Sequence, residues 1–353
     1  MKRKDFLKTA LLTASSVVLP TKSFPAEKNR NKKKEIIKPL ALKDNATIGL
    51  IAPASYIDEN ELIDSKNNLA DLGFKTLNTD RILKRFGYLA GDDKNRADDL
   101  NEMFSRKDVD AIVCVRGGYG CARMLDMIDY KLIKKNPKIL IGYSDITALL
   151  FALYSQVGLI TFHGPVGTST FNNYSIDSFV NVLMYGKKNY LPPLAEDDLY
   201  NEDLAYSRYT INSGKTQGIL IGGNLSIVVS MLGTKYDVDY SGKIIFLEEI
   251  GEEPYRIDRM LSQLILAGKF KNAAGIVLGV FRNCERKRIN PSFEATFKLR
   301  DVLEDRLKGL GIPVFYGFSF GHVTNKITIP FGIKAEMDAD NFSLKYLESA
   351  VLK

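Results

Sequence analysis

The chain of 353 residues contains no tryptophan, only two histidines and only three cysteines. An odd number of cysteines without metal-like spacing argues against a disulfide framework and against a zinc site. Cys114 lies inside the apolar run DAIVCVR, where a small buried hydrophobe is a better interpretation than a nucleophilic thiol. With so few histidines, any serine–histidine mechanism must use His163 or His322.

The chain also lacks an excess of charge over most of its length. The formal net charge is +7, but residues 1–34 hold ten Lys/Arg against two Asp/Glu, which leaves thirty-nine basic and forty acidic residues in 35–353. A role in nucleic-acid binding needs a basic face, and this balanced composition does not supply one. We therefore expect no nucleic-acid partner.

The first residues resemble an export signal. MKRKDFLKTALLTASSVVLP has a positive start and an apolar stretch over residues 10–19, which is too short to span a bilayer. RKDFLK is similar to the twin-arginine signal, but Lys4 stands in place of the second arginine, so the Sec and Tat routes both stay open. We expect cleavage after about residue 23, a periplasmic product and no stable membrane insertion after processing. The alternative is a disordered basic tail.

Short apolar runs alternate with amphipathic stretches from Ala46 onward. DENELIDSKNNLADLG predicts one of the helices, with Asp58 near its start and Gly73 just past its end. Continuous apolar strands that alternate with helices predict a parallel sheet covered on both faces, as in doubly wound α/β folds of the Rossmann or flavodoxin type. The later runs are richer in β-formers and alternate less regularly with helices.

Between residues 187 and 214 the alternation dissolves into prolines, acids and tyrosines without a clear period. Such a stretch is typical of a linker that crosses between domains. We therefore expect an export signal with a basic linker, an N-terminal α/β domain, an inter-domain linker and a C-terminal domain, at residues 1–34, 35–186, 187–214 and 215–353.

Polar residues and glycines follow several of the predicted strands, and ligands of parallel sheets gather at the carboxyl ends of the strands. The residues in these positions are Ser55, Arg116, Gly117, Gly118, Ser144 and His163. KILIGYSDITALLFAL places Ser144 and Asp145 at the corner between a strand and a helix. Two interpretations stay open: a helix cap, or a nucleophile on a tight turn to which Gly142 allows close backbone approach.

An apolar strand, KIIFLEE, ends in Glu248 and Glu249. One of two adjacent strand residues faces inward, and a buried carboxylate needs a partner such as an imidazole N–H. A nucleophilic serine needs a neighbouring base, and that base needs a carboxylate to fix its tautomer. Ser144, Glu248 and His322 are therefore a candidate triad, and the N–H groups of the RGGYG turn and of Asp145 are candidate oxyanion donors.

Seven segments taken together resemble the LD-carboxypeptidase family, the muramoyltetrapeptide carboxypeptidases whose serine peptidase group includes microcin C7 self-immunity proteins. The segments run from about residue 46 to 334 and are IGLIAPAS, RGGYGCARMLD, IGYSDITALL, FHGP, GGNLSIVVSMLGT, FLEEIGEEPYRIDRML and FGH…ITIPFG. The resemblance implies a doubly wound N-terminal α/β domain and a smaller, β-rich α+β C-terminal domain. It also implies a nucleophilic Ser144, completed by Glu248 and His322 across the cleft between the two domains. Glu249 leaves the register of the acid open, because such sequences often carry aspartate there.

The resemblance also implies oxyanion donors at Gly117 or Gly118 and at Asp145. For the substrate, the strand-end positions of Ser55, Arg116 and His163 make these residues the expected contacts, with Ser55 and Arg116 the candidates for binding a terminal carboxylate. The alternative for Arg116 is an ion pair with a neighbouring acid.

The expected activity is that of an exported serine L,D-carboxypeptidase that releases terminal D-alanine from peptidoglycan tetrapeptide stems. No metal or organic cofactor is expected, and the expected partners are peptidoglycan-derived peptides and a second copy in a homodimer. One alternative is an immunity-type hydrolase that cleaves a peptidyl-nucleotide antibiotic, against which export argues, because such toxins act in the cytoplasm. The other is a non-catalytic periplasmic binding protein with two α/β domains around a cleft.

Overall fold

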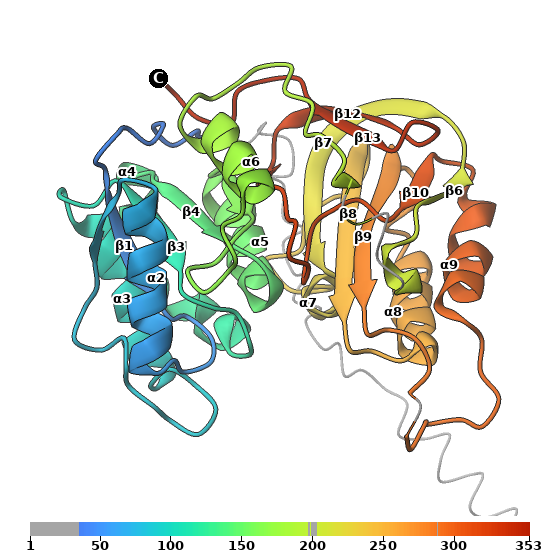
Figure 1. Cartoon of the computed structure of the whole chain (residues 1–353), viewed down its shortest axis with the longest axis horizontal. Helices are drawn as coiled ribbons and strands as arrows, with labels where there is room; N and C mark the ends of the chain where they lie inside the picture. Colours follow the sequence, from blue (N-terminus) through green and yellow to red (C-terminus); the bar gives the residue numbers. More distant parts are fainter. Residues whose placement is uncertain (1–34, 197, 199–202, 288) are drawn as a thin grey trace, which may run out of the picture. The chain divides into compact units, whose positions relative to one another are not determined.

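A computed structural model describes residues 35–196, 198, 203–287 and 289–353. Residues 35–353 form one compact unit that contains two β-sheets flanked by helices (Figure 1). The predicted export signal lies in residues 1–34, outside the described residues. Within the described part of the chain, no helix has both the length and the apolar character needed to cross a membrane.

The first sheet has six strands in the order β11-β5-β4-β3-β1-β2. The five strands from β2 to β5 run parallel to one another, and β11 pairs antiparallel with β5. β3 and β4 are buried along their whole length, because helices cover both faces of such a sheet. The strands are β1 Thr47–Ile51, β2 Lys75–Leu77, β3 Ala111–Cys114, β4 Ile139–Gly142, β5 Thr161–His163 and β11 Ile329–Phe331.

Helices alternate with these strands, which confirms the predicted α/β architecture. α2 (Glu59–Asp71) begins with a capping box in which the Asp58 carboxylate accepts from the Glu61 amide and the Glu61 carboxylate accepts from the Asp58 amide. Gly73 follows its end with φ +84°, as the sequence predicted. The other helical elements of this part are α3 Asp93–Ser105, η1 Cys121–Met127, α4 Tyr130–Lys135, η2 Ser144–Ile146, α5 Thr147–Val157 and α6 Asn173–Leu183.

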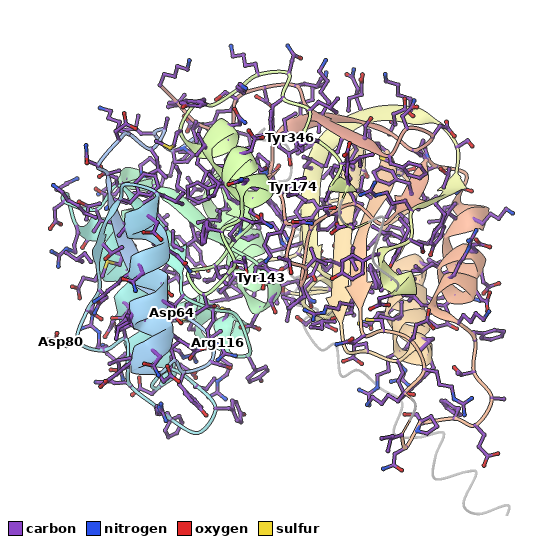
Figure 2. The ribbon with its side chains drawn as sticks, viewed as in Figure 1. Asp64, Asp80, Arg116, Tyr143, Tyr174 and Tyr346 are labelled. Atoms are coloured by element: carbon purple, nitrogen blue, oxygen red, sulfur yellow. The ribbon has the colours of Figure 1, made fainter. Side chains whose placement is uncertain are left out.

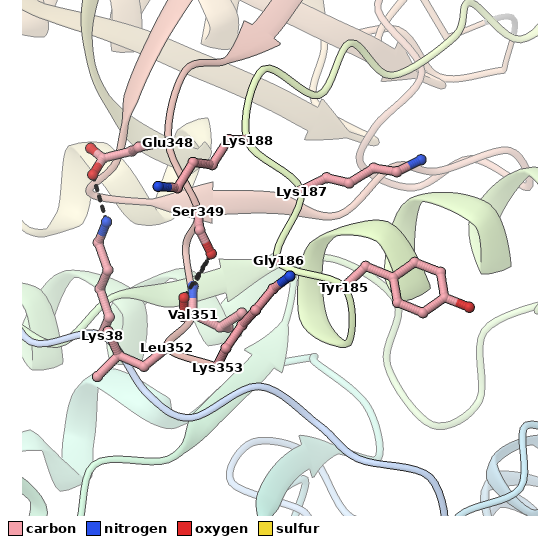
Figure 3. Close-up of a pocket in the computed structure, with 10 residues that line it drawn as sticks. All are labelled: Lys38, Tyr185, Gly186, Lys187, Lys188, Glu348, Ser349, Val351, Leu352 and Lys353. Carbon is pink, nitrogen blue, oxygen red and sulfur yellow. Dashed lines mark hydrogen bonds and ion pairs between the residues drawn. The ribbon is translucent and has the colours of Figure 1, made fainter.

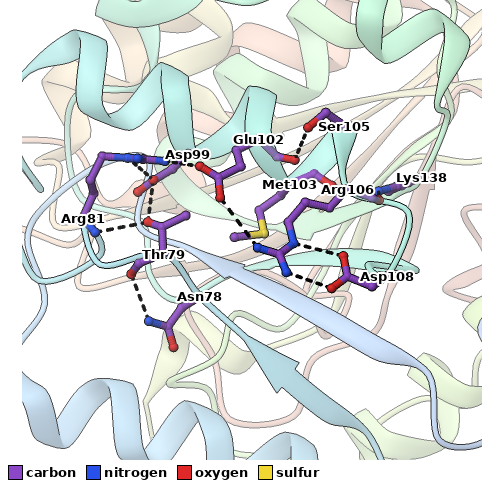
Figure 4. A network of polar contacts seen from close by, with 10 residues as sticks. All are labelled: Asn78, Thr79, Arg81, Asp99, Glu102, Met103, Ser105, Arg106, Asp108 and Lys138. Atoms are coloured by element: carbon purple, nitrogen blue, oxygen red, sulfur yellow. Dashed lines mark hydrogen bonds and ion pairs between the residues drawn. The ribbon is translucent and has the colours of Figure 1, made fainter.

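A polar network fastens the chain after β2 to α3 (Figure 4). The Arg81 guanidinium donates to the carboxylates of Asp99, at 2.7 Å, and Glu102, at 2.5 Å, and the Thr79 hydroxyl donates to Asp99 at 2.6 Å. Burial raises the pKa of Asp99, while the bonds from Thr79 and Arg81 oppose that shift. The network thus provides partners for a carboxylate that the fold buries.

The second sheet has seven strands in the order β13-β12-β7-β8-β9-β10-β6, of which β7, β8, β9 and β10 run parallel. Figure 1 shows α8 and α9 beside it. Its strands are β6 Tyr209–Asn212, β7 Lys215–Asn224, β8 Lys243–Ile250, β9 Gly275–Arg282, β10 Val314–Tyr316, β12 Lys334–Asp338 and β13 Ser343–Tyr346. The helical elements of this part are η4 Leu204–Tyr206, α7 Leu225–Ser230, α8 Pro254–Leu266, α9 Leu299–Leu307 and η5 Lys308–Leu310.

Two strands lie outside the parts to which the sequence pattern assigned them. β6 falls inside the stretch 187–214 that was expected to be a linker, yet it is an edge strand of the second sheet. β11 falls in the C-terminal part of the chain, yet it closes the edge of the first sheet beside β5. The chain therefore crosses from the second sheet back to the first after β10.

The loop before β11 is held by side chains of α6. The Ser178 hydroxyl accepts from the Thr328 amide at 2.9 Å, and the Ser175 hydroxyl accepts from the Lys326 amide at 3.2 Å. Asn172, the N-cap of α6, donates to the Asn325 side chain at 2.7 Å. The loop that carries His322 is thereby fixed against the part of the chain that carries Ser144.

Candidate active site

Ser144 stands at the sharp corner between β4 and the helical segment η2–α5, and its backbone is strained. Its φ is +65°, a left-handed conformation that costs a residue with a side chain about 1–3 kcal/mol and persists only where the surroundings impose it. No side-chain cap bond is present at the start of η2 or of α5. The geometry favours the interpretation of Ser144 as a half-buried nucleophile on a tight turn over that of a helix cap.

Glycines allow other backbone segments to approach this corner. A β-carbon on Gly117 would lie 2.9 Å from the Cβ and 3.2 Å from the Oγ of Ser144, so any larger residue would displace the serine. A β-carbon on Gly142 would lie 2.9 Å from the side chain of Ile146, which occupies the place of the last glycine in G-x-S-x-G. Gly118 has φ +120° and lies against Ser55, whose hydroxyl accepts from the Tyr119 amide at 3.2 Å.

Asp145 connects the serine corner to the glycine turn. Its carboxylate is buried and accepts a hydrogen bond of 2.8 Å from the amide of Cys121. Burial raises the pKa of Asp145, and the bond from Cys121 opposes the shift. The side chain of Asp145 therefore helps to fix the segment that follows Gly117 and Gly118. The backbone N–H of Asp145 is part of the corner next to Ser144.

His322 and Glu248 form the second half of the site. Glu248 lies near the end of β8 with no exposed surface, and its Oε2 is 2.7 Å from Nδ1 of His322. Burial raises the pKa of Glu248, but the charge and hydrogen bond of His322 outweigh it, so the net shift is downward. Burial alone would lower the pKa of His322, and the charge and hydrogen bond of Glu248 raise it on balance. Gly321, at φ +97°, allows this approach, since a β-carbon there would lie 2.6 Å from Oε2 of Glu248.

Glu249 points to a different set of partners. Its carboxylate accepts from the Asn224 side chain at 3.0 Å, from the amide and hydroxyl of Ser226 at 2.8 and 2.6 Å, and from the Ile250 amide at 2.8 Å. Four donors make Glu249 a structural anchor for the start of α7. Of the two adjacent acids, Glu248 is the one that contacts His322.

A hollow of about 400 Å³ brings the corner, the glycine turn and His322 together. Two of its residues, Arg116 and Tyr143, are labelled in Figure 2. It is lined by Glu61, Arg116, Gly117, Gly118, Tyr143, Ser144, Val166, Thr168, Ile250 and His322. Arg116 is half-exposed and pairs with Glu61 at 3.0 Å, so a cation stands at the mouth of the hollow with part of its surface free.

The other two residues expected to contact a substrate lie outside this lining. Ser55 supports the glycine turn from behind. His163 is 1% exposed, and its ring packs against Tyr143, Phe246 and Phe320 with centroids 5.4–6.1 Å apart. Neither of its ring nitrogens has a hydrogen-bond partner among the described residues, and burial lowers its pKa to about 4. This position gives no support to a direct contact between His163 and substrate.

Tyr143 and Lys326 belong to the site but were not singled out from the sequence. The Tyr143 ring stands edge-on to the His322 ring, with centroids 4.9 Å apart, and the Lys326 ammonium lies 5.4 Å from the centre of the Tyr143 ring. Lys326 is 5% exposed and makes no ion pair with any described residue. Burial lowers its pKa to about 8. The available signal was a lysine placed directly before ITIPF, the run that leads into the buried strand β11.

Models of the LD-carboxypeptidase N-terminal and C-terminal domains match residues 48–164 and 217–337. The chain belongs to the LD-carboxypeptidase family. A protein of Bacillus subtilis named "Probable murein peptide carboxypeptidase" is 41% identical over 302 residues, which cover 85% of this chain and 91% of that protein. The microcin C7 self-immunity protein MccF of Escherichia coli is 31% identical over 340 residues, covering 88% and 95%.

The structural comparison agrees with this membership. The crystal structure of muramoyltetrapeptide carboxypeptidase from Oxalobacter formigenes superimposes with a TM-score of 0.72 at 27% identity, over 85% of this chain and 97% of that one. The expected two-domain α/β fold is thus confirmed, and the chain is a peptidase of the carboxypeptidase type. The catalytic roles of Ser144, Glu248 and His322 stay predictions, for which the geometry above is the support.

Proposed function

We propose that this chain is a serine L,D-carboxypeptidase that releases the terminal D-alanine of peptidoglycan tetrapeptide stems. The observation that carries the proposal is the bond of 2.7 Å between Glu248 and His322, made beside a serine whose strained corner lines the same hollow as the imidazole. A buried carboxylate that fixes the tautomer of a histidine base is the arrangement that activates a serine.

In the proposed reaction the Oγ of Ser144 attacks the carbonyl carbon of the scissile bond while His322 accepts the hydroxyl proton. Glu248 stabilises the imidazolium that forms. The negative charge on the carbonyl oxygen is stabilised by N–H groups of Gly117 or Gly118 and of Asp145. His322 then donates its proton to the leaving nitrogen of D-alanine as the C–N bond breaks. Water, activated by the same histidine, hydrolyses the acyl-enzyme and frees the shortened peptide and Ser144.

Recognition of the peptide end is assigned to Arg116. Its guanidinium lines the hollow, and its single carboxylate partner, Glu61, leaves other donors for a substrate. An arginine can bind a carboxylate through two parallel hydrogen bonds, which are stronger than bonds between neutral groups. We expect the free terminal carboxylate of the substrate to bind there, with Thr168 nearby in the lining.

A second candidate is hydrolysis of a peptidyl-nucleotide antibiotic, which the similarity to a microcin C7 self-immunity protein favours. The chemistry would be the same, since both reactions are acyl transfers to serine, so substrate preference decides between them. Export of the chain and its assembly into a homodimer stay predictions from the sequence.

The test is digestion of defined peptides read out by mass. We expect a stem tetrapeptide to lose D-alanine, while its C-terminally amidated form and the all-L tetrapeptide are poor substrates. A pentapeptide that ends in D-Ala-D-Ala should be cleaved slowly, because its scissile bond follows a D-centre. Rapid cleavage of the pentapeptide would contradict the proposal, and faster cleavage of a peptidyl-nucleotide than of the tetrapeptide would support the second candidate.

A further inference from the structure

Three adjoining hollows form a surface that is unusually rich in cations. Their volumes are about 610, 610 and 280 Å³; the first two share Tyr185 and Leu352, and the second and third share Leu40 and Lys43. Of the eleven charged side chains that line them, nine are Lys or Arg and two are acidic. The charge of residues 35–353 as a whole is balanced, so the composition conceals this local excess of positive charge.

Six of the lysines on this surface are exposed and form no ion pair with any described residue, namely Lys43, Lys107, Lys135, Lys187, Lys188 and Lys353. Figure 3 shows three of them, Lys187, Lys188 and Lys353, around the first hollow, where Lys38 is bound to Glu348. The charge on the exposed six is therefore available to a partner outside the chain.

Large apolar side chains stand among these lysines. Leu40, Tyr185 and Leu352 are 65%, 58% and 51% exposed. Exposure of such apolar side chains to water is unfavourable, and contact with an apolar partner would remove that cost. An amphipathic partner with negative charges above an apolar layer suits this mixture better than a purely polar polyanion does.

The surface lies at the edge of the first sheet opposite to the candidate active site. Lys107 precedes β3, whereas Arg116 follows it, and Lys138 precedes β4, whereas Ser144 follows it. Since these strands are parallel, their starts and ends mark opposite edges of the sheet. A partner on the cationic surface would therefore leave the hollow at Ser144 accessible.

Residues near the start of the described chain line this surface. Lys38 lines the first hollow and Leu40 the second, and Leu40 makes a β-bridge with Leu352. The preceding residues, KNRNKKK at 28–34, contain five lysines and arginines. Clusters of lysine and arginine are typical of proteins that bind anionic membranes, where each cation near the surface adds to the affinity.

We propose that this cationic surface binds peripherally to a membrane that contains anionic phospholipid. Lysines contact the headgroup phosphates, while Leu40, Tyr185 and Leu352 enter the boundary with the acyl chains. A second copy of the chain is a poorer occupant, because two faces of the same sign would repel. A nucleic acid offers the phosphates but no apolar layer for the leucines.

The experiment measures partition of the full chain between buffer and phosphatidylcholine vesicles with and without phosphatidylglycerol. The test variant is Lys187→Glu/Lys188→Glu, whose side chains are exposed. The matched control is Lys84→Glu/Arg85→Glu, an adjacent exposed pair beyond the carboxyl end of β2 that also forms no ion pair with any described residue and has the same change of charge. Thermal unfolding and peptide cleavage check that both variants fold. If the Lys187→Glu/Lys188→Glu variant does not fold, Lys43→Glu/Lys353→Glu replaces it as the test variant.

We expect binding only to vesicles with phosphatidylglycerol, a fall of about tenfold or more for the test pair, and a change within about twofold for the control pair. Binding should also weaken as salt rises. An equal fall in both pairs would show that only total charge matters and would overturn the proposal. Stronger binding of the same surface to an oligonucleotide, or a dimer that the test pair dissociates, would overturn it as well. Peptide cleavage is independent of this result, so a failure here and a failure of the proposed function are distinguishable.

Discussion

The carboxylate of Asp145 accepts a hydrogen bond of 2.8 Å from the backbone amide of Cys121, across twenty-four residues of sequence. The bond joins the corner that carries Ser144 to the turn that carries Gly117 and Gly118. The proposed nucleophile and the proposed oxyanion donors are thus held in one arrangement by a side chain that need not touch the substrate.

Asp145→Ala is therefore expected to slow turnover by about ten- to a hundredfold, since a buried hydrogen bond to a charged group is worth about 1.5–3 kcal/mol. Asp145→Asn keeps an acceptor for the Cys121 amide and should recover most of the loss. Steady-state kinetics on the tetrapeptide measure both, with kcat expected to change more than KM. Equal damage by the two variants would show that the bond to Cys121 is not what matters.

Replacement of Ser144 separates catalysis from backbone strain. Ser144→Ala and Ser144→Gly should both reduce the rate by a factor on the order of 10⁴ to 10⁶, because each removes the proposed nucleophile. Glycine adopts φ +65° without strain, so the glycine variant should be about 1 kcal/mol more stable than the alanine variant. Urea denaturation compares the two, and an alanine variant that is the more stable of the pair would contradict the strained corner.

The two adjacent acids of β8 should fail in different ways. Glu248→Gln leaves the fold intact and lowers the rate by about 10⁴, since a neutral amide does not stabilise the imidazolium. Asn224 and Ser226 donate hydrogen bonds to the Glu249 carboxylate, and in Glu249→Gln an amide NH₂ group, itself a donor, would face some of these donors. This variant should therefore lose about 1–3 kcal/mol of stability and change turnover little. Thermal unfolding together with kinetics on both variants checks the assignment, which the opposite pattern would reverse.

The pH dependence of cleavage should report on His322. A base must be neutral to accept the serine proton, and Glu248 raises the pKa of His322 above 6.5, so kcat/KM should rise with pH and reach half its maximum above 6.5. Glu249 also raises the pKa of this imidazole, whereas Lys326 lowers it. Lys326→Met should therefore raise the pH at which kcat/KM is half-maximal by about 0.5–1 pH unit. A downward shift would exclude this electrostatic role.

His163 predicts how stability depends on pH. Its pKa is lowered to about 4 in the folded chain, against 6.5 when unfolded, so the unfolded state binds the proton first as pH falls. Stability is therefore lost between about pH 6.5 and 4, and by pH 4.5 this one residue accounts for about 2–3 kcal/mol. Denaturation of the wild type and of His163→Phe at pH 7 and 4.5 measures the difference. Phenylalanine suits the surrounding aromatic rings, and an unchanged pH dependence would refute the assignment.

The first sheet could be predicted because its signals are local. Asp58 caps a helix, Gly73 ends it, and apolar runs mark the buried strands, all within a few residues of sequence. The corner at Ser144 was likewise visible as a strand that runs directly into a helix. What the sequence could not decide was whether Ser144 caps a helix, because that depends on its backbone angle.

The remaining features depend on contacts between distant segments. Alternation along β8 predicts that Glu248 and Glu249 face opposite sides of the strand. Only the position of the distant His322 loop decides which of the two carboxylates contacts the histidine. The sequence of β6 has no clear period, and its hydrogen-bonded partner β10 is about a hundred residues away, so the local pattern predicted a linker there instead of a strand. The burial of Lys326 and the cationic surface both arise from packing of segments more than a hundred residues apart, for which periodicity carries no information.

The position of β11 has a consequence for the order in which the protein is made. The strand at residues 329–331 completes the sheet that begins at residue 47, so β5 has an unpaired edge until nearly the whole chain has left the ribosome. Such a distant pairing is slow to form, and the loop that carries His322 is drawn into place by the same event. We therefore expect a nascent chain that ends before β11 to leave the edge of β5 open and the loop of His322, the proposed base, without its final support.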